Sequence, residues 1–440
     1  MPKAAVLFIV SISMAYDRRF RIGYWLSYAS LEHGGVGPYA LRTISALLAA
    51  GDSGFSFALL CHEADQALVN KIVADAHQNA EIHLIPPAPL NLGSEQRIVG
   101  ATTTRVDSAS KAEYLTLTHL QPWLDGLQLD LMHFPMSTPP HSQGHVPYMV
   151  PPLLEMRMPY IATIHDLQEL LLPEYFSPAQ RAIRAMHKWE VVDQACKIIV
   201  SYDHVKQDLI KYFPLSAEKI HVCPIAYQSI SFPEPSSVAG NIYEEKYRSW
   251  SPFLLYPAQT WPHKNHNLLL QALQNIRRRR GMDLRLICTG QSNDYQQVII
   301  AKAEALGIGD AVLFAGIVPE EELAWLYRHT ALVTIPTEYE AGSFPLIEAI
   351  LLGVPVICSN VTSLPETIGD RRFTFSPNDL DALSHLMVRM LTDASFRQDN
   401  ITNSTRRAEN LRSIDSAAQF YATYETLLAP GLERVCDPGR

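Results

Sequence analysis

The stretch ALVTIPTEYEAGSFPLIEA, residues 331–349, decides the fold. It opens with a short apolar run, continues through a loop of small and acidic residues, and takes up a helical pattern at Pro345. A continuous apolar run bounded by turn residues is typical of a strand buried on both faces of a parallel sheet. Proline suits the first helical turn, because its missing N–H would have no partner there. We therefore expect a strand, a loop and a helix, the repeating unit of a doubly wound α/β fold.

The same unit recurs along the chain. Apolar runs alternate with helical patterns, at 4–11, 55–61, 81–86, 130–135, 159–166 and 197–201 and then at 252–258, 283–290, 311–317, 331–336 and 353–359. The rhythm is lost between Phe232 and Ser251, where we place a domain boundary. The sequence predicts two facing Rossmann-like domains with a cleft between them, at residues 1–235 and 236–410. A C-terminal helix within 411–440 is expected to pack back toward the first domain.

Composition narrows the class of protein. The 440 residues carry a formal charge of -9, which offers no general attraction to nucleic acid. The six cysteines lack the short paired spacings of zinc sites and small disulfide scaffolds, which favours buried thiols in a reducing compartment. The apolar start at 4–10 fits a buried first strand better than a signal peptide. No run approaches the ~20 apolar residues of a membrane-spanning helix. We expect a cytoplasmic protein.

Two carboxylates bracket the loop and helix start. Glu340 lies in the loop and Glu348 a turn into the helix, where each can accept hydrogen bonds from hydroxyl groups. Gly342 and Ser343 leave backbone amides free to bind a phosphate at the helix N-terminus. The alternative is that Glu348 only complements the helix dipole and Glu340 is solvated. The pattern favours a polyhydroxylated ligand that carries a phosphate.

Three further motifs fall at expected strand ends. Lys264, in YPAQTWPHKNH, follows a strand and precedes a helix, a suitable place to neutralise a diphosphate. The glycines of HGGVGPY, residues 33–39, precede a helix expected from Ala40, and their spacing does not support a nicotinamide or flavin cofactor. His165 can contact a substrate hydroxyl, with Asp166 orienting its ring. Each motif alone also fits an ordinary structural residue.

Taken together, these residues resemble the retaining glycosyltransferase family 4, which has the GT-B fold, over nearly the whole chain. Glu340 and Glu348 match that family's pattern of two glutamates separated by seven residues. The resemblance implies that Glu340 contacts the transferred sugar and Glu348 the ribose. It further implies that the amides of Ser343 and Phe344 bind the sugar or diphosphate, and that Lys264 stabilises the leaving phosphate.

The resemblance extends to weaker positions and has one gap. Gly34, Gly35 and Gly37 match a loop beside the diphosphate, and His165 matches a histidine near the sugar ring. Gly290, Ile317 and Val318 match positions whose backbone brackets the base. The family often has an arginine five residues before the lysine, where this chain has Gln259. Either Lys264 then carries more of that role or another base helps.

The implied function is the retaining transfer of a sugar from a nucleotide-sugar to a saccharide or lipid-linked acceptor. Mannose from GDP-mannose is the first expectation, ahead of UDP-sugars, and surface polysaccharide assembly is the expected setting. In this family the leaving phosphate is thought to take up the acceptor proton, so the resemblance implies no dedicated carboxylate base. The nucleotide-sugar is a substrate, and no cofactor is expected. No metal is expected either, because Asp379-Leu380-Asp381 fits a helix cap.

Two alternatives to transfer remain open, as does the surface on which the protein works. A sugar-nucleotide epimerase of the same shape, or a non-catalytic sugar-nucleotide-binding subunit, also fits parts of the pattern. The arginines and aromatic residues at 16–25 fit peripheral contact with the inner face of a membrane, although an ordinary loop explains them too. The oligomeric state is left open.

Overall fold

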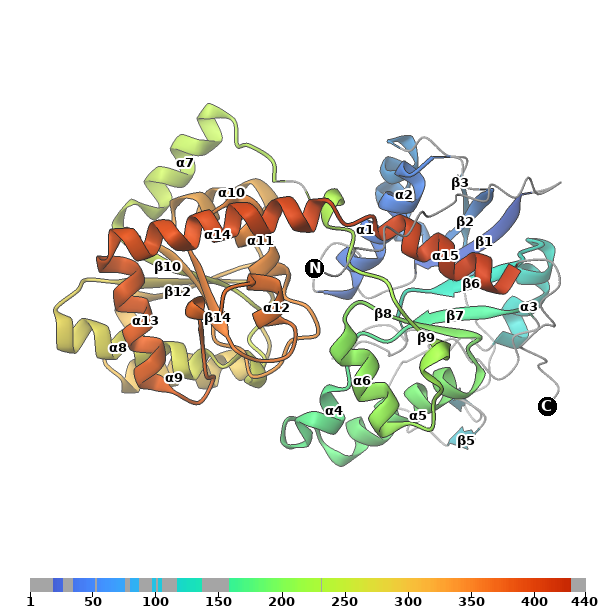
Figure 1. Ribbon diagram of the computed structural model, residues 1–440, viewed down its shortest axis with the longest axis horizontal. Coiled ribbons are helices and arrows are strands. Elements are labelled where there is room, and N and C mark those ends of the chain that lie inside the picture. Colours follow the sequence, from blue (N-terminus) through green and yellow to red (C-terminus); the bar gives the residue numbers. More distant parts are fainter. Residues whose placement is uncertain are drawn as a thin grey trace, which may run out of the picture.

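The computed structural model describes residues 19–26, 35–51, 54–75, 80–86, 97–99, 102–104, 117–136, 158–230 and 232–428. The chain forms two α/β halves that lie side by side, each built on its own sheet (Figure 1). We call them the N-terminal half and the C-terminal half. This arrangement confirms the predicted pair of Rossmann-like sheets, whereas the domain limits 1–235 and 236–410 remain predictions.

The sheet of the N-terminal half is parallel throughout its described strands, in the order β3-β2-β1-β6-β7-β8-β9. The strands are β1 Phe20–Leu26, β2 Phe55–Cys61, β3 Ala80–Leu84, β6 Leu131–Phe134, β7 Tyr160–Thr163, β8 Lys197–Val200 and β9 Ile220–Val222. A separate antiparallel pair joins β4 Arg97–Val99 to β5 Thr102–Thr104. The order reverses direction between β1 and β6, and ligands of such sheets bind at this kind of switch point.

The sheet of the C-terminal half repeats the plan, in the parallel order β12-β11-β10-β13-β14-β15. Its strands are β10 Phe253–Pro257, β11 Arg285–Thr289, β12 Val312–Gly316, β13 Leu332–Ile335, β14 Val356–Ser359 and β15 Thr374–Phe375. Here the order reverses between β10 and β13. The two motifs that contain Lys264 and Glu340 follow these two strands, so the fold brings them to the same edge of the sheet.

Helices cover the sheets. In the N-terminal half they are α1 Val36–Ala49, α2 Gln66–Ala74, α3 Leu117–Gly126, α4 Gln168–Leu171, α5 Pro178–Gln194 and α6 Asp203–Tyr212. The C-terminal half is covered by α7 Ser237–Tyr247, α8 His266–Arg280, α9 Tyr295–Ala305, α10 Glu320–His329, α11 Phe344–Leu352, α12 Leu364–Ile368, α13 Leu380–Thr392 and α14 Ala394–Arg412. The last described helix is α15 Ser416–Leu428. Helix α7 occupies much of the segment in which the apolar rhythm is lost.

Most expected strands are present, but one expectation about the N-terminal region is wrong. The run 20–25, interpreted as a loop or membrane-facing segment, lies in β1, an inner strand flanked by β2 and β6. Its residues from Ile22 to Leu26 are buried, so they offer no surface to a membrane. Arg21 misled the prediction, because it sits at the strand entrance where Glu81 accepts a hydrogen bond from its guanidinium. The strand expected at 4–11 lies outside the described residues.

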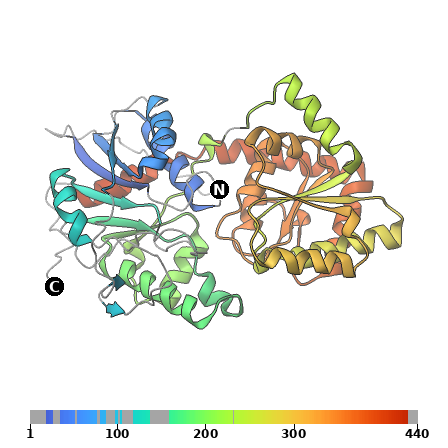
Figure 2. The same cartoon turned by 180° about the vertical axis from the view of Figure 1, so that it is seen from behind.

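The chain crosses from the C-terminal half to the N-terminal half between α14 and α15, so that α15 lies against the N-terminal half, as Figures 1 and 2 show from opposite sides. Its Tyr421 hydroxyl donates to the carbonyl oxygen of Leu47 at 2.6 Å, and its Tyr424 hydroxyl is hydrogen-bonded to Nδ1 of the buried His133 at 2.8 Å. The Tyr421 ring also stacks on Phe55. The end of the described chain therefore completes the core of its first half.

The cysteines can be compared with the expectation of buried, free thiols. Four cysteines are free and buried, namely Cys61, Cys223, Cys288 and Cys358. Cys196 is buried but disulfide-bonded, so the expectation of a free thiol is wrong for this residue. Spacing along the chain does not limit which cysteines folding can bring together.

Within the described residues, no helix is both long and apolar enough to cross a membrane.

We predict that Tyr424→Phe destabilises the N-terminal half by about 1–3 kcal/mol, because it removes the hydroxyl partner of a buried histidine. Thermal unfolding should show a lower midpoint, whereas Glu425→Gln, an exposed change on the same helix, should leave it unchanged. Equal midpoints for Tyr424→Phe and the wild type would show that this contact does not hold the helix in place.

Candidate active site

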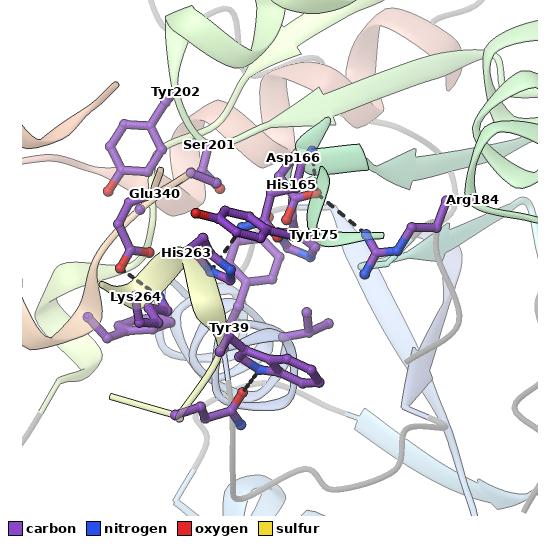
Figure 3. A pocket seen from close by; sticks show the side chains of 18 of the residues that line it. Tyr39, His165, Asp166, Tyr175, Arg184, Ser201, Tyr202, His263, Lys264 and Glu340 are labelled. Atoms are coloured by element: carbon purple, nitrogen blue, oxygen red, sulfur yellow. Dashed lines mark hydrogen bonds and ion pairs between the residues drawn. The ribbon is translucent and has the colours of Figure 1, made fainter. Parts of the chain in front are cut away.

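A cavity of about 280 Å³ lies between the two halves. Figure 3 shows many of the side chains that line it, which come from loops at strand ends and from helices of both halves. Its lining includes half of the expected catalytic and donor-binding residues: Gly35, His165, Gln259, Lys264, Glu340, Gly342 and Phe344. Folding thus brings together motifs that are more than 300 residues apart along the chain, since Gly35 and Phe344 both line it.

The Lys264 segment is a tight turn between β10 and α8. A single 3-10 turn, Pro262–Lys264, leads into Asn265, whose backbone is left-handed and whose side chain caps the helix by accepting from Leu268 N. The Tyr256 hydroxyl donates to the carbonyl oxygen of Lys264 at 2.7 Å. These contacts fix the backbone that carries the ammonium group.

The Glu340 loop, between β13 and α11, is tied directly to that turn. Both the Glu338 amide and the Thr337 hydroxyl donate to the carbonyl oxygen of His263, at 2.8 and 3.0 Å. On its other side, Glu340 N donates to the hydroxyl of Thr362 at 3.3 Å. The two functional loops therefore behave as one connected piece of backbone.

Lys264 and Glu340 form an ion pair inside the cavity, visible as a dashed line in Figure 3. Lys264 Nζ donates to Glu340 Oε1 at 2.6 Å. Glu340 is only 7% exposed, so the alternative in which its side chain is solvated is wrong. Burial raises the pKa of Glu340, and the Lys264 ammonium offsets part of that rise. The N-terminal half covers the Glu340 loop, and this contact between the halves could not be predicted from the sequence.

The start of α11 has the expected form. Ser343 is the N-cap, with its hydroxyl accepting from Leu346 N, and Pro345 lies in the first turn. Gly342 is required by a close approach, because a Cβ there would lie 2.4 Å from the ring of Tyr202 in the N-terminal half. The small residue thus lets the two halves meet at the helix start. The amides at this terminus match a phosphate site in type and place.

Glu348 lies outside the cavity lining but near it. Its carboxylate accepts from the Tyr327 hydroxyl at 2.9 Å and faces Arg42 of α1, with Nη2 3.7 Å from Oε1. Burial raises the pKa of Glu348, while Arg42 opposes the rise. The alternative in which Glu348 only complements the helix dipole does not account for these two partners.

The N-terminal half contributes His165 at the end of β7. Its Nε2 is hydrogen-bonded to the carbonyl oxygen of Pro135 at 2.9 Å, and its ring packs edge-on against Tyr39. Because a carbonyl only accepts, Nε2 carries the proton and Nδ1 is left as an acceptor. Burial lowers the pKa of His165, which keeps the ring neutral near pH 7. Pro135 rather than Asp166 orients the ring.

Asp166 belongs instead to a buried charge network. Arg184 Nη1 lies 3.9 Å from Asp166 Oδ1 and 3.6 Å from a carboxylate oxygen of Glu169. Lys188 Nζ lies 2.6 Å from both oxygens of Glu169. The sequence prediction missed Arg184, which lines the cavity, because it lies inside helix α5 rather than at a strand end.

The glycine run is only partly a loop. Gly35 caps α1, but Gly37 lies within the helix, which begins at Val36 rather than at Ala40. Gly37 thus lies in the first helical turn and not in a loop, and its contact with the donor remains a prediction. Gly34 lies outside the described residues. Of the three, Gly35 lines the cavity.

The remaining predicted positions are more distant. Gly290 follows β11 and has φ +120°, and a Cβ added to it would lie 2.9 Å from the backbone of Ala258. Because glycine has no side chain, its backbone can lie close to the turn that carries Gln259. Ile317 and Val318 follow β12, and Ile317 is 49% exposed. None of Gly290, Ile317 and Val318 lines the cavity, and their role at the base remains a prediction.

Sequence reasoning also missed contacts across the cavity. The Tyr175 hydroxyl, from the N-terminal half, donates to Glu338 of the C-terminal half. The Gln168 side chain meets His263 at 3.4 Å. Such pairs carry no local sequence signal, since each member is an ordinary polar residue in its own segment. They hold the two halves in a closed arrangement.

The charged pair at 379–381 is a helix cap, as predicted. Asp379 Oδ1 accepts from Ala382 N at 2.8 Å at the start of α13. Among the residues that the structure describes, no group of three or more His, Cys, Asp or Glu side chains is placed to hold a metal ion.

Two family models match the chain, one in each half. The model described as Glycosyltransferase Family 4 matches residues 33–226, and the model described as Glycosyl transferases group 1 matches residues 244–407. The O-antigen chain mannosyltransferase B of Escherichia coli is 30% identical over 269 residues, which cover 61% of this chain and 70% of that protein. The MMP alpha-(1->4)-mannosyltransferase of Mycolicibacterium hassiacum is 30% identical over 227 residues, covering 50% and 52% of the two chains.

Solved structures share the fold. HepE of Anabaena in complex with UDP-glucose has a TM-score of 0.64 at 14% identity, covering 93% of this chain and 100% of that one. Sucrose-phosphate synthase of Thermosynechococcus elongatus has a TM-score of 0.63 at 18% identity, with coverages of 93% and 100%. With the two matching family models and the mannosyltransferase relative, this establishes that the chain belongs to glycosyltransferase family 4, a family of retaining hexosyltransferases with the GT-B fold.

Proposed function

We propose that this glycosyltransferase moves mannose from a nucleotide-sugar to a hydroxyl group of a saccharide or lipid-linked acceptor, within the cavity between its halves. The observation that carries the proposal is the Lys264–Glu340 ion pair. It lies at the switch point of the C-terminal sheet, in a cavity that residues of the N-terminal half enclose. It places a cation, a carboxylate and a helix N-terminus around a single enclosed space.

The C-terminal half holds the donor. Lys264 and the amides of Ser343 and Phe344 stabilise the diphosphate, whose negative charge grows as the bond to the sugar breaks. Glu340 accepts hydrogen bonds from hydroxyls of the transferred sugar, and Glu348 from those of the ribose. When the donor binds, its phosphate becomes a second anionic partner for Lys264, so the ammonium bridges Glu340 and the leaving group.

The proton of the acceptor passes to an oxygen of the leaving phosphate. The new bond joins the acceptor oxygen to the anomeric carbon, on the face from which the phosphate leaves. The bond between the anomeric carbon and the oxygen of the leaving phosphate breaks. Glu340 already accepts from Lys264 at 2.6 Å, which suits an orienting role better than that of a free base. His165, neutral and with Nδ1 as an acceptor, binds a sugar hydroxyl from the opposite side.

The choice of sugar rests on the relatives. The proteins from Escherichia coli and Mycolicibacterium hassiacum are named mannosyltransferases, so mannose is the proposed sugar and GDP-mannose the first donor to test. HepE binds UDP-glucose in its solved structure, which makes UDP-sugars the second group. One of the relatives is named an O-antigen chain mannosyltransferase, which supports a role in polysaccharide assembly. The proposed location is the cytoplasm, where the protein would bind its nucleotide-sugar donor.

Family membership decides among the broader alternatives. An epimerase would need acid–base groups on both sides of a sugar carbon. A non-catalytic subunit would not need the Lys264–Glu340 pair. Transfer accounts for this pair together with His165 on the facing half.

We predict that Lys264→Gln and Glu340→Gln each lower the transfer rate at least about a hundredfold, because each removes a charge aligned with the reacting groups. Each single change also leaves a buried partner unpaired, which lowers the thermal midpoint. The double variant Lys264→Gln/Glu340→Gln should regain much of that stability and none of the activity. Near-normal turnover in either single variant would refute the site, and recovery of turnover in the double variant would show that the pair is only structural.

We also predict that transfer continues in excess chelator and does not rise when manganese is added. The charge facing the diphosphate comes from groups of the protein itself, Lys264 and the N-terminus of α11 among them, so no bound ion is needed to supply it. Rates measured with GDP-mannose after extensive treatment with EDTA test this. A rate that collapses and returns only with a divalent cation would contradict it.

A further inference from the structure

The cations that line the cavity are already engaged. Of the lining residues that the structure describes, Lys264 and Arg184 are the cationic ones, and both face carboxylates. Gln259, which stands where related proteins often have an arginine, uses its amide oxygen to accept from Trp261 Nε1 at 2.6 Å. A diphosphate therefore meets less positive charge on this side of the cavity than the chemistry calls for.

Arg42 brings a further cation to the start of α11 from the facing half. It lies on α1 on the same helix face as Val36 and Tyr39, which line the cavity, since the three are spaced at i, i+3 and i+6. Its guanidinium carbon stands 4.5 Å from the ring centroid of Phe344, the first residue of α11 and itself part of the lining. Stacking on this ring fixes the direction of the long side chain.

The hydrogen-bonding capacity of Arg42 is not used up. Its Nη2 lies 3.7 Å from Glu348 Oε1, beyond the usual N–H···O range of about 2.7–3.2 Å. Its Nη1 is buried and has no hydrogen-bond partner within the described part of the chain. A buried guanidinium nitrogen without a partner is costly, so the arrangement is completed when an anion or other acceptor arrives.

We propose that Arg42 binds the phosphate attached to the ribose of the donor, and so replaces from the opposite half the charge that Gln259 does not supply. The inference rests on the proposed function, in which Glu348 binds the ribose. The phosphate on the 5′ oxygen of that ribose then lies between Glu348 and the first turn of α11, which is the region that Arg42 faces. Lys264, next to Glu340, serves the phosphate attached to the sugar.

The two cations can be separated with ligands that differ by one phosphate. Affinities for guanosine, GMP and GDP, and for the uridine series, are measured by calorimetry, with ligand-observed NMR for the nucleosides. Arg42→Gln should weaken binding of both the monophosphate and the diphosphate about tenfold or more and leave the nucleoside unchanged. Lys264→Gln should weaken binding of the diphosphate alone. Arg42→Lys, which keeps the charge, should recover part of the loss.

The controls distinguish local from general effects. Arg248→Gln removes an arginine that is 67% exposed and paired with Glu245, and it should change none of these affinities. Thermal midpoints of all variants report whether the halves remain folded.

Three results would overturn the inference. One is unchanged affinity of Arg42→Gln for the monophosphate. Another is an equal loss for the nucleoside, which would mean that Arg42 acts only by holding Glu348. The third is a wild-type protein that binds neither series, which would refute the proposed function as well. If the wild type binds the nucleotides and Arg42→Gln binds the monophosphate with the same affinity, the proposed function stands and the role of Arg42 is refuted.

Discussion

The ion pair between Lys264 and Glu340 is the constraint on which the site depends. It joins two loops that leave adjacent strands, and the Glu340 loop also donates two hydrogen bonds to the carbonyl oxygen of His263 in the Lys264 turn. Burying two charges costs free energy that their mutual attraction only partly recovers. A protein that needed only stability could place apolar residues there. The retained charges are best understood as groups held ready for a polar, phosphate-bearing ligand.

Neither half could form this site alone. The C-terminal half provides the ion pair and the start of α11, and the N-terminal half encloses them through Tyr202 against Gly342 and Tyr175 against Glu338. Enclosure matters because it lowers the local dielectric and strengthens every charge interaction inside. Helix α15 adds a third link between the halves by returning to the first core. The relative placement of the halves is thus part of the chemistry, since charges on one act on groups held by the other.

The charge around the cavity is balanced more closely than the sequence suggests. Arg184 and Lys188 face Asp166 and Glu169, while Lys264 faces Glu340. Arg42 faces Glu348 at 3.7 Å, stacks on Phe344 at the start of α11, and has one guanidinium nitrogen that is buried without a hydrogen-bond partner in the described chain. These contacts at the start of α11 are the basis for inferring that Arg42 is available to a ligand. On this inference, Arg42 supplies to a diphosphate the positive charge that glutamine at position 259 does not.

The sequence by itself determined the fold class, the strands from β2 to β14 that are continuously apolar, the helix start beside Pro345 and the cap at Asp379, because these follow from periodicity and local hydrogen bonding. It failed at β1, where Arg21 broke the apolar pattern, and at Gly37, where a helix begins four residues earlier than expected. Only the tertiary structure decided that Glu340 is buried, that Tyr202 requires Gly342, and that Arg42 faces Glu348. Each of these depends on two segments far apart in the chain, and the distance between such segments is fixed by packing rather than by any local pattern.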